Sequence, residues 1–346
     1  MKSSREELMV SLARLKPALA SGGVVPELSH VWFDGSCAQA YDGGFGIKLD
    51  LKTDLDCGIP GAALLGLLDT SALDQVTLEP NGAALQVKLG KSNSKLAILE
   101  ANRKVWPFPL KLPRNAEPLA LGEDFIEGLR KTLFIKASPA TRVEHHGVMV
   151  QVNKNNLELY STDSATMARA IIKGAAKGAP FERTLLPRDF AEQLVAQSPE
   201  GVKLYVLDDC LIAEAEGISF YSNVLDISGA DDMSGIMAKN MTKHPDAVPL
   251  PPGLDGALSR AEILSGKEDA ALEIAVDGDT LKLTGTYALG AVNESLILEG
   301  KPPAAKLRVR AELLRRALAH VESFSLTKDS LLLRGEPDFV YLVASL

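Results

Sequence analysis

The sequence predicts an α+β fold of three repeated domains, each with two helices packed on antiparallel sheet. Each third of the chain carries two short Leu-rich amphipathic stretches, and each stretch precedes runs in which apolar and polar residues alternate. The thirds recur at a spacing of roughly 115 to 130 residues, which is the size of a whole domain rather than of a solenoid repeat. We expect domains at residues 1–113, 118–240 and 248–346.

The boundaries between these domains are predicted from proline. Proline fixes φ and donates no backbone hydrogen bond, so clusters of it favour extended connectors over helices or strands. The two clusters that fall between the repeats are Pro107, Pro109, Pro113 and Pro118, and then Pro245, Pro249, Pro251 and Pro252.

Two amphipathic helices are predicted in each repeat. At the start of the chain Leu8, Leu12 and Leu15 recur at steps of three and four and form one apolar stripe, while Ser4 with Glu7 supplies a capping box. The predicted ranges are 7–19, 123–134 and 254–264 for the first helix of each repeat, and 59–68, 186–195 and 309–321 for the second.

Alternating segments predict the strands. Leu49, Leu51, Thr53 and Leu55 alternate with charged residues, which is the two-residue period of a half-buried strand. The same pattern returns at 148–152, 157–160, 272–276, 281–283 and 331–333. Helices on one side of an antiparallel sheet are the arrangement that this order favours.

Charge and cysteine content restrict the class of protein. With 37 Lys and Arg against 45 Asp and Glu the net charge is -8, so nucleic-acid binding requires a local basic patch. Cys37, Cys57 and Cys210 are isolated and lack the spacing of a zinc site, which predicts a reducing compartment. The charged first residues and the short apolar runs predict a soluble cytoplasmic protein without a membrane segment.

Four segments carry a family resemblance: 260–265, 147–168 with Thr162-Asp163 near its end, 186–188 and 341–343. In order and spacing they resemble the bacterial DNA polymerase III β subunit, the DNA sliding clamp. The resemblance implies three sliding-clamp domains that form half of a closed ring, a homodimer that encircles double-stranded DNA without reading its sequence, and helices that line the hole. It also implies that a DNA polymerase and a clamp loader bind through a short peptide motif.

Cations on the predicted helices are the candidates for contact with DNA. On the last helix the apolar residues share one side, which leaves arginines on the opposite one. Such side chains neutralise phosphates without reading bases. The alternative is ordinary solvation of an exposed helix face. The DNA-facing candidates are Arg14, Arg130, Lys131, Arg142, Arg308, Arg315 and Arg316.

Two loops depart from the family pattern. Relatives often carry an arginine in the loop after the first helix, where this chain has Gly22-Gly23-Val24-Val25. After Arg142, Val143-Glu144 replaces an aromatic pair. We therefore do not expect these loops to grip DNA directly.

The resemblance also implies an apolar pocket for partner peptides between the second and third domains. Several family Arg, His and Pro side chains are replaced here by Ser, Ala or Thr, so we expect a changed peptide preference. For the apolar members the alternative is ordinary core packing. The matching positions are His145, Thr162, Ser164, Ala165, Thr166, Met167, Ala230, Ser234, Leu342, Val343, Ala344, Ser345 and Leu346.

The same resemblance implies candidate residues for the interface that closes the ring. Ile263 and Leu264 match third-domain interface residues, and Leu96 and Ile98 match a first-domain edge strand. Head-to-tail pairing of edge strands removes exposed backbone groups. The alternative is that Ile263 and Leu264 pack in the core of their own domain.

Three apparent motifs carry no chemistry. Gly90-Lys91-Ser92 lacks the earlier glycine of a phosphate loop. Adjacent His145 and His146 point to opposite faces of a strand and have no third ligand nearby. Asp50, Asp54 and Asp56 form the wet face of an alternating segment. We predict no catalytic residue, no metal and no cofactor.

The leading hypothesis is thus a processivity clamp that tethers the replicative polymerase and is not an enzyme. The first rival is a clamp-like module that captures replication factors without encircling DNA. A nucleic-acid enzyme that depends on Asp50 or Asp54 is a third, weaker hypothesis. The altered pocket is typical of a divergent member and leaves both a bacterial and a phage origin open.

Overall fold

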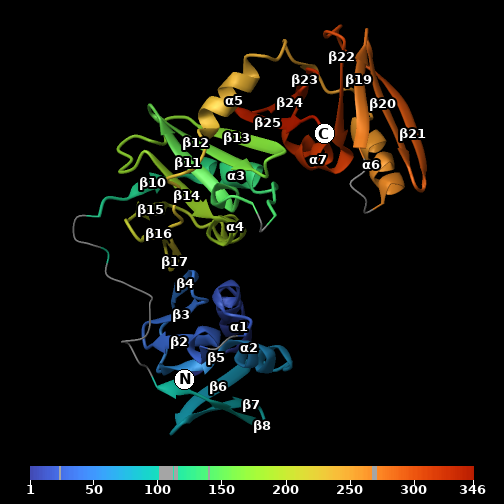
Figure 1. The fold of residues 1–346 in the computed structure, drawn as a ribbon. Helices are drawn as coiled ribbons and strands as arrows, with labels where there is room; N and C mark the ends of the chain where they lie inside the picture. The colour runs from blue at the N-terminus through green and yellow to red at the C-terminus, as the bar shows by residue number, and fades with distance from the viewer. Residues whose placement is uncertain (23–24, 101–111, 113–115, 139–140, 267–270) are drawn as a thin grey trace. The chain divides into compact units, whose positions relative to one another are not determined.

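The computed structural model describes residues 1–22, 25–100, 112, 116–138, 141–266 and 271–346 (Figure 1). These fall into two units. Unit 1 comprises Met1–Gly122 and Glu192–Val224, and unit 2 comprises Glu123–Ala191 and Leu225–Leu346. Gly23, Val24, Pro107, Pro109 and Pro113, on which parts of the sequence analysis rest, lie outside the described residues.

The described residues of unit 1 form two antiparallel sheets and, wholly within the unit, the helices α1 (Arg5–Ala13) and α2 (Gly61–Asp69). The smaller sheet has the order β1 (Lys2–Ser4), β6 (Gln75–Asn81), β7 (Ala84–Leu89) and β8 (Ser92–Ala97). The larger sheet has the order β10 (Leu119–Leu121), β15 (Val202–Val206), β16 (Cys210–Ala215), β17 (Ile218–Asn223), β4 (Phe45–Asp50), β3 (Cys37–Tyr41), β2 (His30–Asp34), β5 (Asp56–Pro60) and β9 (Leu99–Glu100).

Unit 2 also holds two antiparallel sheets, with α3 (Glu123–Thr132), α5 (Met233–Met241), α6 (Leu254–Ser265) and α7 (Ala311–Ala317). The larger has the order β14 (Arg183–Pro187), β11 (Gly147–Asn153), β12 (Asn156–Thr162), β13 (Thr166–Ile172), β25 (Phe339–Ala344), β24 (Ser330–Gly335), β23 (Ser323–Leu326) and β18 (Val248–Pro249). The smaller has the order β21 (Gly290–Ile297), β20 (Thr280–Tyr287), β19 (Ala271–Asp277) and β22 (Ala305–Arg310).

Strand pairing crosses the predicted domain boundaries. β17 of the middle repeat pairs with β4 of the first, and β13 of the middle repeat pairs with β25 of the third. Helix α4 (Arg188–Gln197) begins in unit 2 and ends in unit 1. Contacts therefore group the chain into two units although the repeats number three, and the boundaries 1–113, 118–240 and 248–346 stay a prediction.

Six predicted helices are confirmed to within a turn or so at their ends. In α1 Leu8 and Leu12 are buried, as is Leu15 just after it, and Ser4 Oγ accepts a hydrogen bond from the Glu7 backbone N–H. Short 3-10 segments complete the first and last of them: Lys16–Ala18 follows α1, and Leu318–His320 follows α7. Because each of these helices buries one apolar stripe, local periodicity was sufficient to locate it.

The strand predicted through Leu55 is wrong beyond Asp50. The chain leaves β4 there, and the Leu51 and Thr53 amides donate to the Ser36 and Gly35 carbonyls of the turn between β2 and β3. Leu55 is nevertheless fully buried. In the loop after Asp50 more buried and more exposed side chains still alternate. The sequence of this loop therefore has the pattern of a strand.

Candidate nucleic-acid interface and partner site

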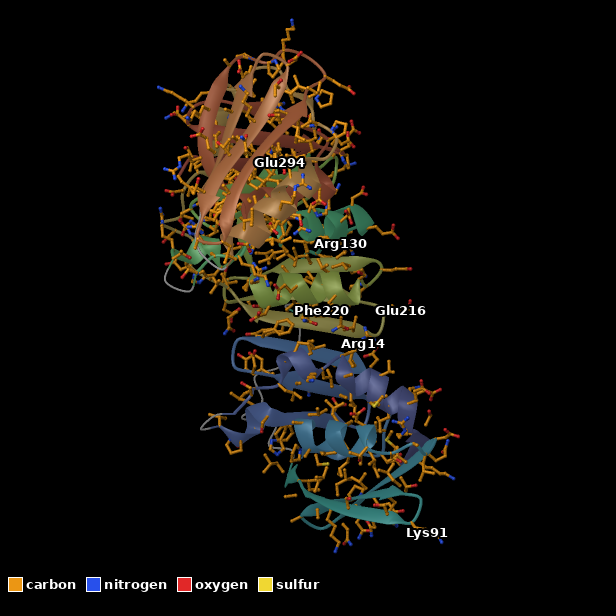
Figure 2. The ribbon with its side chains drawn as sticks, turned by 90° about the vertical axis from the view of Figure 1, so that its right-hand side faces the viewer. Arg14, Lys91, Arg130, Glu216, Phe220 and Glu294 are labelled. Atoms are coloured by element: carbon orange, nitrogen blue, oxygen red, sulfur yellow. The ribbon has the colours of Figure 1, made fainter. Side chains whose placement is uncertain are left out.

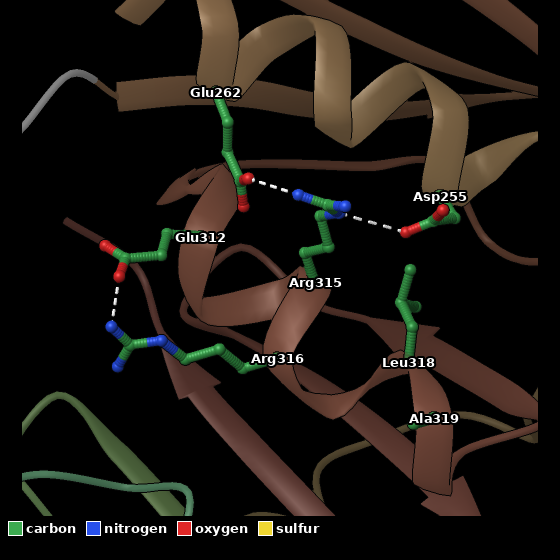
Figure 3. A pocket seen from close by; sticks show the side chains of 7 residues that line it. All are labelled: Asp255, Glu262, Glu312, Arg315, Arg316, Leu318 and Ala319. Atoms are coloured by element: carbon green, nitrogen blue, oxygen red, sulfur yellow. Dashed lines mark hydrogen bonds and ion pairs between the residues drawn. The ribbon is translucent and has the colours of Figure 1, made fainter. Parts of the chain in front are cut away.

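Helices α6 and α7 place arginines beside acidic residues on one surface of unit 2 (Figure 3). Asp255 and Glu262 lie two turns apart on α6, and Arg315 of α7 reaches both carboxylates. Arg315 Nε donates to Asp255 Oδ1 at 3.1 Å, and Nη1 donates to Glu262 Oε2 at 2.7 Å. On the same surface Arg316 pairs with Glu312 one turn earlier on α7. These groups line a shallow depression of about 630 Å³.

Arg308 differs from the sequence prediction, which placed it on the last helix. The structure has it on strand β22, before α7 begins at Ala311. Its backbone amide and carbonyl bond to Ser345 and Leu346 at the end of the chain. The apolar stripe of α7 made the prediction extend the helix too far toward its N-terminus, so Arg308 does not share the arginine face of α7.

Lys131 of α3 also differs from the prediction of an exposed cation. Its side chain is 9% exposed, and Nζ donates to the Glu336 carbonyl at 2.9 Å. Arg130, the next residue, is exposed and pairs with Glu127 on the same helix (Figure 2). Lys131 therefore joins α3 to the β24–β25 turn, and only Arg130 of the two presents its charge at the surface.

The remaining DNA-facing candidates also bond to their own chain. Arg14 Nε donates to Gln197 Oε1 at 2.8 Å within unit 1. Arg142 forms an ion pair with Asp231 at 2.7 Å and donates to the Gly229 carbonyl at 2.7 Å. Arg142 thus holds the segment that leads into α5. Among the candidates on helices, Arg130, Arg315 and Arg316 are exposed, and each is paired with a carboxylate of the chain. Contact of these residues with DNA stays a prediction.

Four of the predicted pocket residues meet at the centre of the larger sheet of unit 2. In the β13–β25 register Thr166 lies opposite Val343 and Met167 lies opposite Leu342, so two segments that are distant in sequence meet as expected. All four side chains are buried. Ala344 continues this pairing through its amide, which donates to the Ala165 carbonyl.

The loop between β12 and β13 forms the edge of this site. Asp163 Oδ1 accepts hydrogen bonds from the Ala165 and Thr166 amides, which fixes the turn. Ser164 has a left-handed φ of 78° and its hydroxyl lies 3.4 Å from His145 Nδ1. Burial lowers the pKa of His145 below its usual 6.5, so the imidazole is neutral at pH 7.

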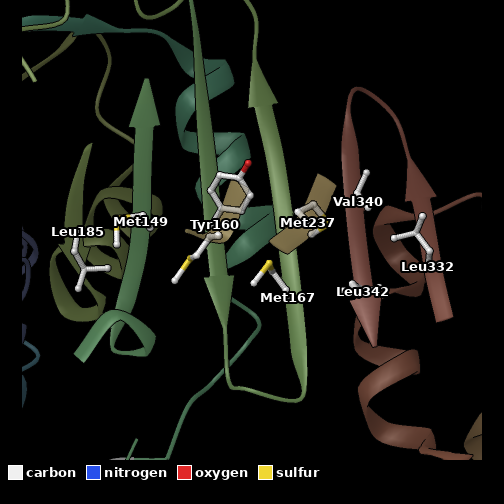
Figure 4. Close-up of a cluster of buried hydrophobic side chains, with 9 residues drawn as sticks. Met149, Tyr160, Met167, Leu185, Met237, Leu332, Val340 and Leu342 are labelled. Carbon is white, nitrogen blue, oxygen red and sulfur yellow. The ribbon is translucent and has the colours of Figure 1, made fainter. Parts of the chain in front are cut away.

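Helix α5 covers the apolar part of the site, and the sequence analysis did not predict it. Met233 and Met237 are 2% and 0% exposed and belong to one buried cluster with Met167 and Leu342 (Figure 4). The predicted residue Ala230 packs against this cluster, and the predicted residue Ser234 is hydrogen-bonded to Tyr160. This face of the sheet is apolar and α5 packs on it, and the partner pocket stays a prediction. Asp232 before three methionines at four-residue spacing was the signal for this helix.

The predicted interface residues lie on or just after β8 in unit 1 and near the end of α6 in unit 2. Leu96 is on β8 and Ile98 follows it, at one edge of the smaller sheet of unit 1. Ile263, at the end of α6, is 68% exposed, which excludes the core alternative for this residue. Leu264 packs over Gly290 of β21, at one edge of the smaller sheet of unit 2. That edge strand also carries Glu294, which pairs with Arg260 of α6.

The described residues contain no group of three or more His, Cys, Asp or Glu side chains placed to hold a metal ion. Burial raises the pKa of Cys37 and Cys210 to about 12, so neither thiol is ionised at neutral pH. Gly90 occupies a tight turn between β7 and β8, as expected for a hairpin rather than a phosphate loop. Among the helices that the structure describes, none has the length and apolarity needed to cross a bilayer.

Comparison with known proteins identifies the fold. No family model matches the chain. A beta sliding clamp from Synechococcus elongatus is 28% identical over 185 residues, which cover 50% of this chain and 48% of that protein. The matched part thus spans about half the length of this curated relative.

Solved structures match over the whole chain. The DNA polymerase III beta subunit of Pseudomonas aeruginosa aligns with a TM-score of 0.84 and 18% identity, covering 100% of this chain and 99% of that one. The polymerase sliding clamp of Bacillus subtilis has a TM-score of 0.83 at 16% identity, with coverage of 100% and 98%. The Helicobacter pylori beta clamp bound to a DNA ligase peptide has a TM-score of 0.83 at 16% identity, with coverage of 100% and 99%. The predicted three-domain α+β fold is confirmed.

Proposed function

We propose that this chain, which has the three-domain fold of the bacterial DNA polymerase III beta subunits, is a DNA sliding clamp. The observation that supports the proposal most strongly is the match over the full length of both chains, at TM-scores of 0.83 and 0.84. A curated relative that matches half of the chain is itself a beta sliding clamp. In this proposal two copies close head to tail into a ring around duplex DNA.

Two of the sheet edges are the surfaces that we assign to ring closure. β8 in unit 1 and β21 in unit 2 each end a sheet, and an unpaired edge strand is a template for pairing with another chain. Exposed Ile263 lies close by in unit 2, and the half-buried Leu96 and Ile98 lie at the edge in unit 1. A head-to-tail dimer pairs one edge with the other and leaves neither exposed.

Retention on DNA in this proposal is topological. A closed ring stays on DNA with weak contacts because escape requires opening, and a tethered polymerase then acts at a raised effective concentration at the primer end. The paired arginines of α7 and α3 suit such weak, sequence-independent contact. The proposal includes no catalytic step and no cofactor, places the protein in the cytoplasm, and assigns partner peptides to the predicted pocket residues of unit 2.

The experiment compares retention on nicked circular DNA before and after linearisation. We expect stable retention on the circle and rapid loss from the linear form. Ile263→Asp should halve the mass of the particle in light scattering and abolish retention, whereas Ile236→Asp, on the exposed face of α5, should change neither. Equal loss from circular and linear DNA contradicts encirclement.

A second candidate is a clamp-like module that binds replication factors without encircling DNA. Its support is the pairing of Arg142, Arg315 and Arg316 with carboxylates of their own chain, which lowers the positive potential available to phosphates. A particle with the mass of one chain at micromolar concentration, with peptide binding intact, would favour this candidate.

A further inference from the structure

One cross-strand row of the larger sheet of unit 2 carries two arginines. In the register of this sheet Arg169 of β13 lies opposite Val340 of β25, and Val340 lies opposite Arg334 of β24. Residues directly opposite one another in antiparallel strands point to the same face of the sheet. Both arginines therefore project from one face, with their Cα atoms two strand spacings or roughly 10 Å apart.

This is the face on which α5 packs, and the arginine row lies toward one end of it (Figure 4). Met167 and Leu332 belong to the buried cluster that includes side chains of α5, and each arginine follows one of them by two residues along its strand. The predicted pocket residues Ala165 and Ala344 lie beyond the opposite end of this cluster. The arginine row is therefore distinct from the predicted partner pocket.

The part of the chain that the structure describes leaves both guanidinium groups without a full set of partners. The Nε atom of each arginine is buried, and no described residue accepts a hydrogen bond from it. Two carboxylates that lie two positions away from this row are bonded elsewhere. Glu158 accepts hydrogen bonds from Asn153 and Tyr160, and Asp338 forms an ion pair with Lys173.

Other arginines of unit 2 show the usual arrangement, since Arg142, Arg260 and Arg315 each pair with a carboxylate. A buried polar group without a partner is explained by strain, by a functional role or by a bound molecule or ion. Strands β13 and β24 are each paired on both sides, which argues against local strain at the arginine row. A bound group is the explanation that remains.

The chemistry of the row selects an anion. A guanidinium group stays charged and presents its N–H donors in a planar fork that matches a carboxylate or a phosphate. Both arginines are half-buried, so an anion bound there is screened by salt less than an anion at a fully exposed cation.

Helix α3, which carries candidates for DNA contact, packs on the opposite face of this sheet. Gly128 of α3 lies against the side chains of Leu159 and Ile172. Along β12 and β13 these two residues alternate with those that share a face with the arginine row. The arginine row is therefore separate from the predicted DNA-facing helices.

We propose that Arg169 and Arg334 together bind an oxyanion, a phosphate or carboxylate group of a ligand other than DNA inside a ring. The two guanidinium groups donate to its oxygen atoms and supply the charge that the neighbouring carboxylates do not. This inference does not rest on the proposed function, because binding of an anion can be measured whether or not the chain is retained on circular DNA.

The test titrates inorganic phosphate into the full chain at constant ionic strength and follows binding by calorimetry. Arg169→Gln and Arg334→Gln should each weaken phosphate binding at least tenfold, because each removes one of the two guanidinium groups. The matched control is Arg260→Gln, which removes an arginine already paired with Glu294 and should bind phosphate as the wild type does. Equal binding by the wild type and both variants, or an equal loss in the control, would overturn the proposal.

A second titrant identifies the source of the oxyanion. A capped peptide of three glutamates carries carboxylates but no phosphate. Tighter binding of phosphate would identify a ligand with a phosphate group, and tighter binding of the peptide would identify an acidic segment. Binding of neither, or binding of both that is unchanged in the two variants, would mean that the row is not an oxyanion site.

Thermal unfolding separates binding from a purely structural role. Phosphate should raise the Tm of the wild type, because a ligand stabilises the state that it binds, and should not raise that of the double variant Arg169→Gln/Arg334→Gln. In chloride alone the double variant should melt no lower than the wild type, since no described residue bonds to either Nε atom. A lower Tm in chloride with an unchanged response to phosphate would contradict the proposal and leave both arginines a structural role.

Discussion

The ion pairs of the α6–α7 face are exposed to solvent, whereas the apolar contacts between α5 and the sheet are buried. Arg315 and Arg316 keep carboxylate partners but stay substantially exposed, so water and salt screen their ion pairs. Met233 and Met237 are covered on all sides. Burial of an apolar side chain of this size contributes about 1.5 to 3 kcal/mol, which solution ions do not screen.

The difference indicates how each surface can exchange its partner. Phosphates can replace Asp255 or Glu262 beside Arg315 at little cost, since one screened contact is exchanged for another. The packing of α5 depends instead on apolar burial, which solution ions do not screen. DNA contact in the proposed clamp should therefore respond to salt, and the packing of α5 should not.

The largest effect is expected from a charge placed in the apolar site. Met237→Asp should lower the free energy of unfolding by roughly 3 kcal/mol or more in urea denaturation, because a carboxylate cannot be buried there without a partner and α5 must leave the sheet. Ile236→Asp, the exposed neighbour, should stay within about 0.5 kcal/mol of the wild type. Similar losses from both variants would remove the distinction between the two faces of α5.

Two adjacent residues of α3, Lys131 and Arg130, allow a buried and an exposed cation to be compared on a single helix. Lys131→Met should destabilise unit 2 by about 1 to 3 kcal/mol, because it removes a nearly buried charged hydrogen bond to the Glu336 carbonyl. Arg130→Met should change stability by less than about 0.5 kcal/mol and weaken DNA binding instead. Urea denaturation and duplex binding of both variants measure this. Weaker DNA binding by Lys131→Met at unchanged stability would restore the sequence-based prediction for Lys131.

Local patterns predicted most of the fold, because the information for each helix lies within a few turns. Leu8, Leu12 and Leu15 are all buried, as their spacing indicated. The pairing of the lysine and arginine side chains could not be predicted in the same way. Lys131 and Glu336 are 205 residues apart, so only the folded chain shows that the cation points inward.

Resemblance predicted which residues of the proposed partner site lie together, but the sequence analysis missed helix α5 beside them. Met167 and Leu342 lie side by side as expected, since each belongs to a strand whose position the repeat fixes. Helix α5 was missed because its stripe has only three members, Met233, Met237 and Met241, and Gly235 interrupts the helix-forming pattern. A short helix that depends on tertiary packing leaves a weak signal in the sequence.

The salt dependence of DNA binding should distinguish the arginines of the α6–α7 face from other surface cations. For Arg315→Ala/Arg316→Ala, the slope of log Kobs against log salt for duplex DNA should become less steep by about 0.9 for each phosphate that the variant no longer neutralises. Lys282→Ala is the matched control, since Lys282 is also exposed and paired, with Asp277, but on a strand outside the α6–α7 face. An equal change of slope in the control would mean that the α6–α7 face has no special role.

The smallest expected effect is a pH response at the flank of α5. Burial is the main cause that lowers the pKa of His244 below 6.5; a hydrogen bond with Ser325 opposes it, and the nearby cations Arg334 and Lys243 add to it. The unfolded chain therefore binds a proton at this position more readily than the folded chain, and unit 2 should lose stability as the pH falls through the range just below 6.5. The Ser325 and Ser330 hydroxyls beside the ring lie on β23 and β24, so protonation should loosen the connection between α5 and these strands.

Hydrogen exchange of α5 at pH 7.5 and pH 5.5, corrected for the intrinsic exchange rate, measures this response. We expect α5 to open more often at the lower pH in the wild type and to show a smaller change in His244→Gln, which keeps hydrogen-bonding groups but does not titrate. His145, whose pKa burial also lowers, lies beside Ser164 at the other edge of the site and supplies the remaining response in that variant. The ion pairs of the α6–α7 face involve carboxylates and arginines, which do not titrate between these pH values. The salt slope of DNA binding should therefore be the same at pH 7.5 and pH 5.5. A change in that slope would mean that the two surfaces do not respond to pH independently.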